Sequence, residues 1–325
     1  KYSVAGCRDK GWKGMKKYCF GADIGGTTVK FGLFDQDGIV LDKWEIPTRT
    51  ENEGAAILPD MAASIREKIQ EHGLKMEEIA GVGVDVPGPI SEDGIVPHTA
   101  NLGWGYKEVT KELTEMTGLP SKAGNDANVA ALGEMWLGGG KGHTNVLLIT
   151  LGTGVGGGIV VDGKILTGAH GAGGEIGHIH VDDEIEECCG CGNQGCLEQF
   201  ASATGIARLG RKILEESDAP SIMRGQEMSA KLVFDSVKEG DALAVQVAER
   251  FGRYLGKAVA GMTAVLDPEI IVIGGGVSKA GPVLLEYVQK YYKPCAFKSA
   301  KDTPFALAEL GNDAGIYGCA KLILG

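Results

Sequence analysis

The sequence is short of positive charge, and it contains no long uninterrupted run of apolar residues. Its formal net charge is −11 over 325 residues, which argues against a nucleic-acid surface because such a surface needs a basic footprint. The nearest candidate for a membrane span, residues 145–161, is interrupted by five glycines, so the pattern favours strands around a turn. We therefore expect neither a nucleic-acid partner nor a membrane partner.

A secretory signal is also missing, since residues 1–14 are polar and basic and have no apolar centre. Met15 followed by two lysines resembles a native start, so we treat residues 1–14 as a leader or a remnant outside the fold. Eight cysteines without a secretory signal indicate a reducing, cytoplasmic location. In such a compartment, clustered thiols bind metal more often than they form disulfides.

What the sequence does contain is an alternation of strand and helix patterns, which predicts a layered α/β architecture. The 52 glycines indicate many tight turns between these elements. Expected strands cover residues 18–23, 29–34, 39–46, 79–86, 146–150, 157–161, 164–167, 269–273 and 305–309, and expected helices cover residues 54–72, 107–116, 125–137, 202–216, 229–239, 242–266, 282–292 and 313–324.

One unit of this pattern occurs twice. Residues 18–46 and residues 146–167 each read as a strand, a Gly/Thr turn, a strand, an Asp–Gly hairpin and a strand. Two such copies predict two related domains, each of which presents one Gly/Thr turn to a cleft. The alternative is that β-hairpins are common and resemble one another by chance.

Four potential metal ligands lie close together in the sequence: His178, Cys189, Cys191 and Cys196. Thiolates and an imidazole suit a tetrahedral Zn²⁺, and four protein ligands would close its coordination shell. The pattern therefore predicts one structural zinc ion, with Cys188 and His180 outside the shell. The alternative is a set of thiols that bind no metal.

A candidate phosphate-binding turn follows the first expected strand. Its members are Asp23, Gly25, Gly26, Thr27, Thr28 and Lys30. Bare glycine backbone lets N–H groups approach an anion, and threonine hydroxyls add further donors. An aspartate at a strand end can also hold a hydrated Mg²⁺. The alternative is an ordinary hairpin turn.

The second Gly/Thr turn contains Thr153 and Gly154 within a GxGxxG match at residues 152–157. A dinucleotide-binding motif needs a helix next, but a strand pattern follows, so we reject that interpretation. Residues 158–164 match GxxxxGK but lack the next Ser or Thr, which also excludes a Walker A loop. A third, weaker candidate is the Gly274-Gly275-Gly276 triplet after an apolar strand pattern, and its alternative is a simple strand-to-helix turn.

Asn125 and Asp126 stand at the start of an expected helix. Both residue types are favoured helix N-caps, and the local sequence by itself favours that role. Only the surrounding pattern can make Asp126 a candidate catalytic base.

Taken together, these segments resemble the ROK family of bacterial sugar kinases, and most closely its glucokinases. The resemblance covers nearly everything after Met15. Two departures are Asp85, where the family commonly has a small or apolar residue, and the additional Cys188. The motifs that carry the resemblance are DIGGTTVKFGLFD, GVDVPGPI, NLGW, GNDANVAALGE, LGTGVGGGIV, HGAGGEIGH, CGCGNQGCLE and GGGV.

The resemblance implies an α/β, two-domain actin/hexokinase-like (ribonuclease H-like) fold with a central cleft. It implies ATP-dependent phosphorylation of a hexose at O6, with Mg²⁺ held between the Gly/Thr turns and Asp126 as the general base. A homodimer is the family expectation. The implied sugar contacts are Pro87, Gly88, Asn101, Asn125, Asp126, Glu175, His178 and Glu198, and His178 would also bind zinc.

We expect residues 15–124 with 312–325 to form the N-terminal domain, and residues 125–311 to form the C-terminal domain with the zinc site. Glucose is the expected substrate, and mannose, fructose or an N-acetylhexosamine is the alternative. A sugar-responsive ROK transcription regulator is disfavoured by the acidic charge and by a first strand so soon after Met15. An actin-like ATPase would have no use for the cysteines or for Glu175 and Glu198.

Overall fold

The computed structural model describes residues 16–99 and 101–325, so the expected leader at residues 1–14 lies outside the described residues. The first half of the chain forms β1 (Tyr18–Ile24), β2 (Thr28–Asp35), β3 (Val40–Pro47), α1 (Glu51–Gly54), α2 (Ile57–Glu71), β4 (Ile79–Val86), β5 (Ile95–Val96), β6 (Lys107–Glu108), α3 (Val109–Thr117), β7 (Ser121–Asn125) and α4 (Asp126–Leu137). The second half forms β8 (Val146–Leu151), β9 (Val155–Val161), β10 (Lys164–Ile165), α5 (Glu198–Ala201), α6 (Ala203–Glu215), α7 (Ala230–Lys238), α8 (Ala242–Leu266), β11 (Ile270–Gly274), α9 (Pro282–Tyr292), β12 (Phe305–Leu307) and α10 (Ala314–Leu324).

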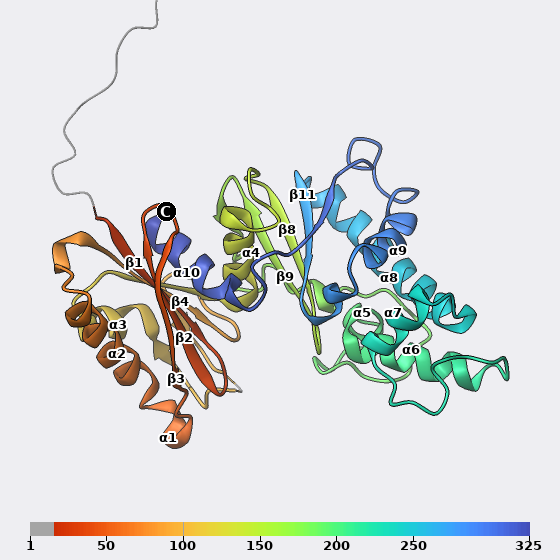
Figure 1. Cartoon of the computed structure of the whole chain (residues 1–325), viewed down its shortest axis with the longest axis horizontal. Coiled ribbons are helices and arrows are strands. Elements are labelled where there is room, and N and C mark those ends of the chain that lie inside the picture. Colours follow the sequence, from red (N-terminus) through yellow and green to blue (C-terminus); the bar gives the residue numbers. More distant parts are fainter. Residues whose placement is uncertain (1–15, 100) are drawn as a thin grey trace, which may run out of the picture.

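Ten of these strands form two five-stranded sheets with the same topology (Figure 1). The strand order is β3-β2-β1-β4-β7 in the first sheet and β10-β9-β8-β11-β12 in the second. In each sheet three consecutive strands are antiparallel neighbours, and two later strands extend the sheet in parallel. The predicted repeat is therefore confirmed, because a chance likeness between hairpins would not extend to the parallel strands.

The first sheet is covered on one face by α2 and α3. Apolar residues at helical spacing on α2, such as Met61 and Ile65, pack with Phe20 and Val82 of the central strands. The opposite face receives the last helix, α10, whose Ile316 and neighbouring residues pack against β1 and β4. The end of the chain therefore returns to the sheet in which the chain begins.

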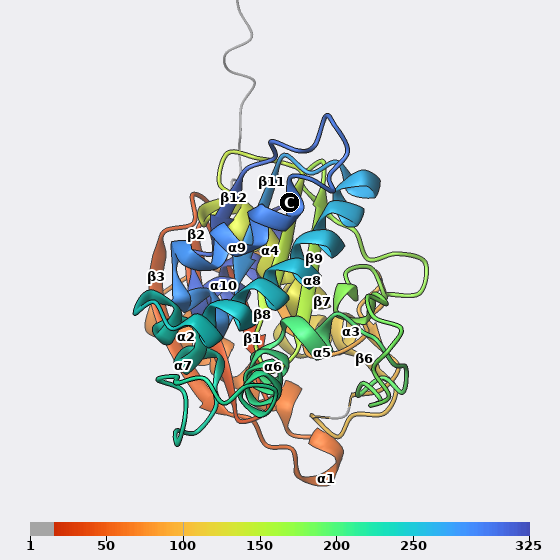
Figure 2. The same ribbon diagram turned by 90° about the vertical axis from the view of Figure 1, so that its right-hand side faces the viewer.

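The second sheet is covered on one face by helices α5 to α9, which lie in sequence between its strands β10 and β12 (Figure 2). Its other face packs against α4, where Leu132 and Met135 contact Leu148 and Val272. Helices α4 and α10 also contact each other closely, and both lie between the two sheets (Figure 1). The start of α4 therefore lies close to strands of both sheets.

The structure differs from the sequence predictions in a missed strand and in the start of one helix. Strand β7 was missed, because its sequence SKAGN has no β-branched or aromatic residue and is fixed by parallel pairing with β4. The helix expected from residue 54 begins at Ile57, because Asn52 and Glu53 have positive φ in the turn before it. The helix expected over residues 202–216 is confirmed as α6, with Ser202 as its N-cap, and the separate short helix α5 precedes it.

No helix among residues 16–99 and 101–325 combines the length and the apolar character that crossing a membrane requires.

Candidate active site

Helix α4 begins at Asn125, a predicted sugar contact, and Asp126, the predicted base, and the structure gives these two residues different surroundings. Asn125 caps the helix, since its side-chain oxygen accepts hydrogen bonds from the N–H groups of Ala127 (3.1 Å) and Asn128 (3.2 Å). Its amide nitrogen donates to the carbonyl oxygen of Gly88 at 3.1 Å, which ties the turn after β4 to this helix. The helix is therefore capped without Asp126.

Asp126 is an exposed residue, and its carboxylate accepts a hydrogen bond from the N–H of Ala127 at 2.8 Å. Desolvation by the protein around it raises the pKa of this carboxyl, and the charges of Asp23 and Glu175 raise it further against the effect of the hydrogen bond. Asp126 is therefore a stronger base than an ordinary aspartate, which suits a group that accepts a proton.

A third aspartate, Asp85, is fully enclosed beside this site. It lies on β4 opposite Asp23 of β1, is 1% exposed, and accepts a hydrogen bond from the N–H of Ile24 at 3.1 Å. Burial, and then the charges of Asp23 and Asp126, hold its pKa well above the usual range. The sequence analysis noted Asp85 as a departure from the family motif but predicted no role for it.

The first Gly/Thr turn joins β1 to β2 as predicted. The N–H of Gly25 donates to the carbonyl oxygen of Thr28 at 3.0 Å, and the Thr48 hydroxyl donates to the carbonyl oxygen of Gly25 at 2.7 Å. The Lys30 ammonium lies 4.0 Å from an Asp23 carboxylate oxygen. The turn thus runs from Gly25 to Thr28, with Asp23 on β1 and Lys30 on β2 beside it.

The second Gly/Thr turn joins β8 to β9, and it is closed by a 3.0 Å hydrogen bond from the N–H of Gly152 to the carbonyl oxygen of Gly154. Because a strand follows, the rejection of both the dinucleotide-binding motif and the Walker A loop is confirmed. Gly275, with φ +82°, passes so close to Leu151 that a Cβ there would lie 2.5 Å from the Leu151 carbonyl oxygen. The third predicted segment therefore lies directly beside the second turn.

Three glycines in these turns have open space next to their backbone. A Cβ built on Gly26, Gly152 or Gly276 would meet no atom of the described residues within 4 Å. No protein contact accounts for glycine at these positions. The missing side chains leave room for a phosphate to approach the backbone at these three positions, which fits the triphosphate of a nucleotide.

The four predicted metal ligands, which we call the cysteine group, converge before α5. They lie in residues 178–196, which we call the cysteine loop. One ligand atom from each residue lies within 4.8 Å of all the others. The Cys191 and Cys196 sulfurs are 3.7 Å apart, and the Cys189 sulfur is 3.7 Å from Nδ1 of His178. Tetrahedral Zn–S bonds of about 2.3 Å place two sulfurs about 3.8 Å apart, so this group fits zinc.

The two spare residues lie outside this group. His180 makes hydrogen bonds with Asp183 (2.8 Å) and with the carbonyl oxygen of Gln194 (3.0 Å), and the carboxylate of Asp183 raises its pKa. Cys188 is exposed. Within the described residues, neither belongs to the group of converging ligand atoms.

The cysteine group contacts both predicted glutamates. Nε2 of His178 lies 3.9 Å from a carboxylate oxygen of Glu175, while Nδ1 of the same ring faces the sulfurs. The Cys189 sulfur lies 3.7 Å from Oε1 of Glu198, whose Oε2 accepts a 2.9 Å hydrogen bond from the N–H of Val155. Glu198 therefore joins the cysteine group to the second Gly/Thr turn, a contact that the sequence did not predict.

The predicted sugar contacts are only partly brought together by observed contacts. Pro87 and Gly88 lie at the end of β4, where Asn125 holds the Gly88 carbonyl oxygen. Asn101 is exposed in the loop between β5 and β6, and its side chain makes no hydrogen bond to any other described residue.

A comparison with known proteins matches residues 19–325 to the ROK family model. The chain belongs to the ROK family. It is 43% identical over 313 residues to a glucokinase of Halalkalibacterium halodurans, with 94% of this chain and 95% of that one covered. It is 38% identical over 313 residues to a glucokinase of Thermotoga maritima, with 93% and 96% covered.

Among solved structures, a ROK family glucokinase from Streptomyces griseus in complex with glucose and AMPPNP is 30% identical, with a TM-score of 0.71. The alignment covers 94% of this chain and 98% of that chain. The family resemblance and the α/β actin/hexokinase-like fold class that were predicted from the ROK motifs are therefore confirmed.

Within the ROK motif GNDANVAALGE, one polar residue has a contact that sequence reasoning missed. Asn128 is 2% exposed, and its amide donates to the carbonyl oxygen of Gly173 at 3.1 Å, which ties the loop before Glu175 to α4. Its position three residues after Asn125 carried no signal, because the contact depends on how a distant loop returns to the helix.

Proposed function

We propose that this ROK protein transfers the γ-phosphoryl group of ATP to O6 of glucose, giving glucose 6-phosphate and ADP. The observation that carries the proposal is the position of Asp126, which is exposed at the start of α4, where a Cβ on Gly156 would lie 3.6 Å from that of the neighbouring Ala127 and where desolvation and then the charge of Asp23 raise the pKa of Asp126. The glucokinases to which the chain is similar over more than nine-tenths of its length support glucose as the substrate.

In this proposal Asp126 is the general base. A sugar hydroxyl is a weak nucleophile until its proton has an acceptor, and a carboxylate within hydrogen-bond reach supplies one. The O6–H bond would break toward Asp126 as O6 forms a bond to the γ-phosphorus, and the bond to the β-phosphate oxygen would break to release ADP. Asn125 would hold the sugar while it caps α4.

The glycine turns are proposed to hold the nucleotide. ATP with Mg²⁺ supplies the phosphoryl group and neutralises charge as it is transferred. The first turn would contribute Asp23, Gly25, Gly26, Thr27, Thr28 and Lys30, and the second would contribute Thr153, Gly154 and the adjoining Gly275 and Gly276. The open space beside the backbone of Gly26, Gly152 and Gly276 supports this assignment.

The sugar end is proposed to contain Pro87, Gly88, Asn101, Asn125, Glu175, His178 and Glu198. A structural Zn²⁺ held by the imidazole of His178 and the three cysteine thiolates would fix the orientation of the ring. The 3.9 Å approach of Nε2 of His178 to Glu175 supports this, because that nitrogen faces away from the sulfurs.

At the level of the whole protein, we propose two domains, residues 15–124 with 312–325 and residues 125–311, that close on the substrates and exclude water. We also propose a homodimer, as the family implies. Light scattering on the purified protein tests this, and a mass equal to one chain would contradict it.

A second candidate is a kinase for another hexose, because mannose and N-acetylhexosamines share most ring hydroxyls with glucose. Steady-state assays with glucose, mannose, fructose, N-acetylglucosamine and N-acetylmannosamine separate these substrates. We expect the highest kcat/KM for glucose. A tenfold higher kcat/KM for another sugar would show that this sugar is the substrate. No turnover with any sugar would reject the proposed activity.

A further inference from the structure

The segment that follows the cysteine group makes three hydrogen bonds to the second Gly/Thr turn. Glu198 accepts from the N–H of Val155 at 2.9 Å. The N–H of Ala203 donates to the carbonyl oxygen of Gly152 at 2.8 Å, and the hydroxyl of Thr204 donates to the carbonyl oxygen of Thr153 at 3.0 Å. The turn is therefore held at nearly every residue by one short stretch of chain, residues 198–204.

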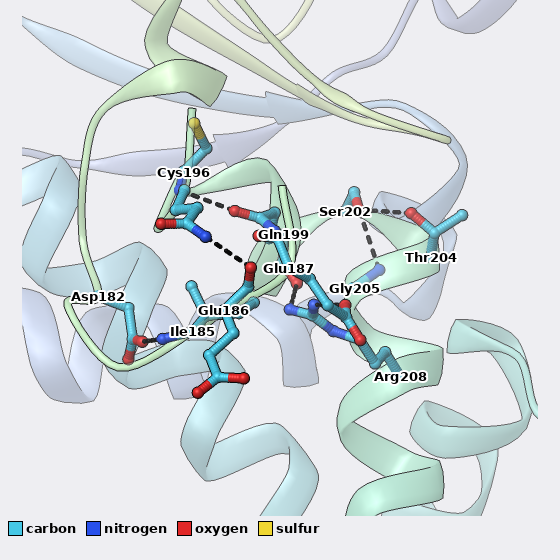
Figure 3. Close-up of polar contacts among 11 residues, drawn as sticks. Asp182, Ile185, Glu186, Glu187, Cys196, Gln199, Ser202, Thr204, Gly205 and Arg208 are labelled. Atoms are coloured by element: carbon cyan, nitrogen blue, oxygen red, sulfur yellow. Dashed lines mark hydrogen bonds and ion pairs between the residues drawn. The ribbon is translucent and has the colours of Figure 1, made fainter. Parts of the chain in front are cut away.

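A break between α5 and α6 places Thr204 for this contact. Ser202 has an extended backbone (φ −73°, ψ 167°), and its hydroxyl oxygen caps α6 by accepting from the N–H of Gly205 at 3.0 Å. The Ser202 and Thr204 hydroxyls lie 2.9 Å apart (Figure 3). The Thr204 hydroxyl donates its proton to the Thr153 carbonyl oxygen. The Ser202 hydroxyl is therefore the donor to the Thr204 oxygen.

The other end of the same segment is attached to the cysteine group. Oε1 of Gln199 accepts from the N–H of Cys196 at 3.1 Å, and its amide donates to the carbonyl oxygen of Glu187 at 2.9 Å (Figure 3). Arg208 of α6 binds the Glu187 carboxylate at 2.6 Å. The segment that carries the cysteines is therefore connected directly to α5 and α6.

We propose that Glu198 and Thr204 are positioning residues for the nucleotide, and that through them the cysteine group controls the geometry of the turn at residues 152–155. This inference rests on the proposed function, since it takes that turn to bind phosphate. It extends the role of the cysteine group from the sugar end to the nucleotide end of the site.

Thr204 gives the cleaner test, because Glu198 is also a proposed sugar contact. Thr204→Val removes the hydroxyl and keeps the shape of the side chain, whereas Thr204→Ser keeps the hydroxyl. We expect Thr204→Val to weaken AMPPNP binding about 3- to 10-fold, the range that one neutral hydrogen bond supplies. The KM for glucose and the melting temperature should stay close to wild type, and Thr204→Ser should bind AMPPNP normally.

Calorimetric titration with AMPPNP measures the first effect, and it requires no turnover. Wild-type AMPPNP affinity in a folded Thr204→Val protein would overturn the positioning role, and so would an equal loss in Thr204→Ser. If wild type binds AMPPNP but phosphorylates no sugar, the proposed function fails while this inference remains open to the same titration.

The coupling to the cysteine group needs a double-mutant cycle. Removal of bound metal by Cys191→Ser should weaken AMPPNP binding, and Thr204→Val should then add less than its full effect, because both changes act through residues 198–204. Unchanged AMPPNP affinity in metal-free protein, or strictly additive effects, would overturn the coupling. The single Thr204 variants decide the positioning role even if Cys191→Ser is unstable.

Discussion

Asn125 and Asp126 are neighbours of similar size and polarity, yet only one of them caps α4. The Asn125 oxygen accepts hydrogen bonds from the N–H groups of both Ala127 and Asn128, whereas the Asp126 carboxylate shares only that of Ala127. The local sequence favoured capping for the pair as a whole, and it could not divide the two roles. That division follows from the extended backbone of Asn125 (φ −69°, ψ 143°), which directs its side chain back over the helix end.

The first prediction concerns Asp126→Asn. We expect kcat to fall by about 10²–10⁴-fold, because the base that accepts the O6 proton is removed. Stability should change little, since Asn125 still caps the helix. In wild type, kcat/KM should fall as pH decreases through the raised pKa of Asp126.

Steady-state kinetics against the exposed control Asp218→Asn measure this effect. A near-normal kcat in Asp126→Asn would leave Asp126 without a catalytic role.

The second prediction concerns Asp85→Asn and the pH dependence of stability. The pKa of Asp85 is raised in the folded state above its ordinary value of 3.8. Below pH 3.8 the carboxyl is protonated in both states. Above it, the unfolded state ionises first, so wild type loses up to about 1.4 kcal/mol of stability per pH unit until the folded-state pKa is reached.

Asp85→Asn has no such loss, so its free energy of unfolding relative to wild type should increase as the pH is raised from 4 to 7. Urea unfolding at several pH values measures the difference. A difference that does not vary with pH would mean that Asp85 titrates normally, despite the charges of Asp23 and Asp126 beside it.

At the scale of elements, long apolar segments were predictable and short ones were not. Strands such as β8 and β11 carry enough apolar residues to be recognised alone. Strand β7 and helix α5 do not, because each depends on a neighbour: β7 pairs with β4, and α5 follows directly from the cysteine loop. The cysteine spacing predicted the four converging ligand atoms, but not the hydrogen bonds that the next segment makes with the second turn.

The third prediction belongs to the cysteine loop. Cys191→Ser should lose zinc and unfold at a lower temperature, because metal binding stabilises the folded loop. Cys188→Ser should keep both zinc and stability, because its sulfur is outside the group. Elemental analysis with thermal unfolding measures both variants. Full zinc occupancy in Cys191→Ser, or zinc loss in Cys188→Ser, would show that the ligand set is different.

Across the whole molecule, the two sheets repeat one topology, and the last helix returns to the first sheet. The repeat was readable from the sequence because each copy keeps its own glycine turn and hairpin. How α4 and α10 meet between the sheets was not readable, because their contact depends on small residues whose partners are distant in sequence. A Cβ on Gly318 of α10 would lie 1.8 Å from the carbonyl oxygen of Val129 in α4.

The fourth prediction tests this contact. Gly318→Ala should lower the free energy of unfolding by about 1–3 kcal/mol, since the two helix backbones must separate. The control is Gly261→Ala in α8, where a Cβ would meet no atom of the described residues within 4 Å. That change should stabilise the protein by about 0.5–1 kcal/mol through helix propensity. Equal effects of the two substitutions in urea unfolding would contradict the close packing of α4 and α10.

The most direct test of phosphoryl transfer to O6 compares glucose with 6-deoxyglucose, which lacks the accepting hydroxyl. The purified protein is incubated with ATP, Mg²⁺ and either sugar, and ADP and glucose 6-phosphate are both quantified. The proposed reaction predicts one glucose 6-phosphate for each ADP with glucose, and no ADP above the sugar-free rate with 6-deoxyglucose. Equal ADP release with the two sugars, or ADP release without glucose 6-phosphate, would contradict it.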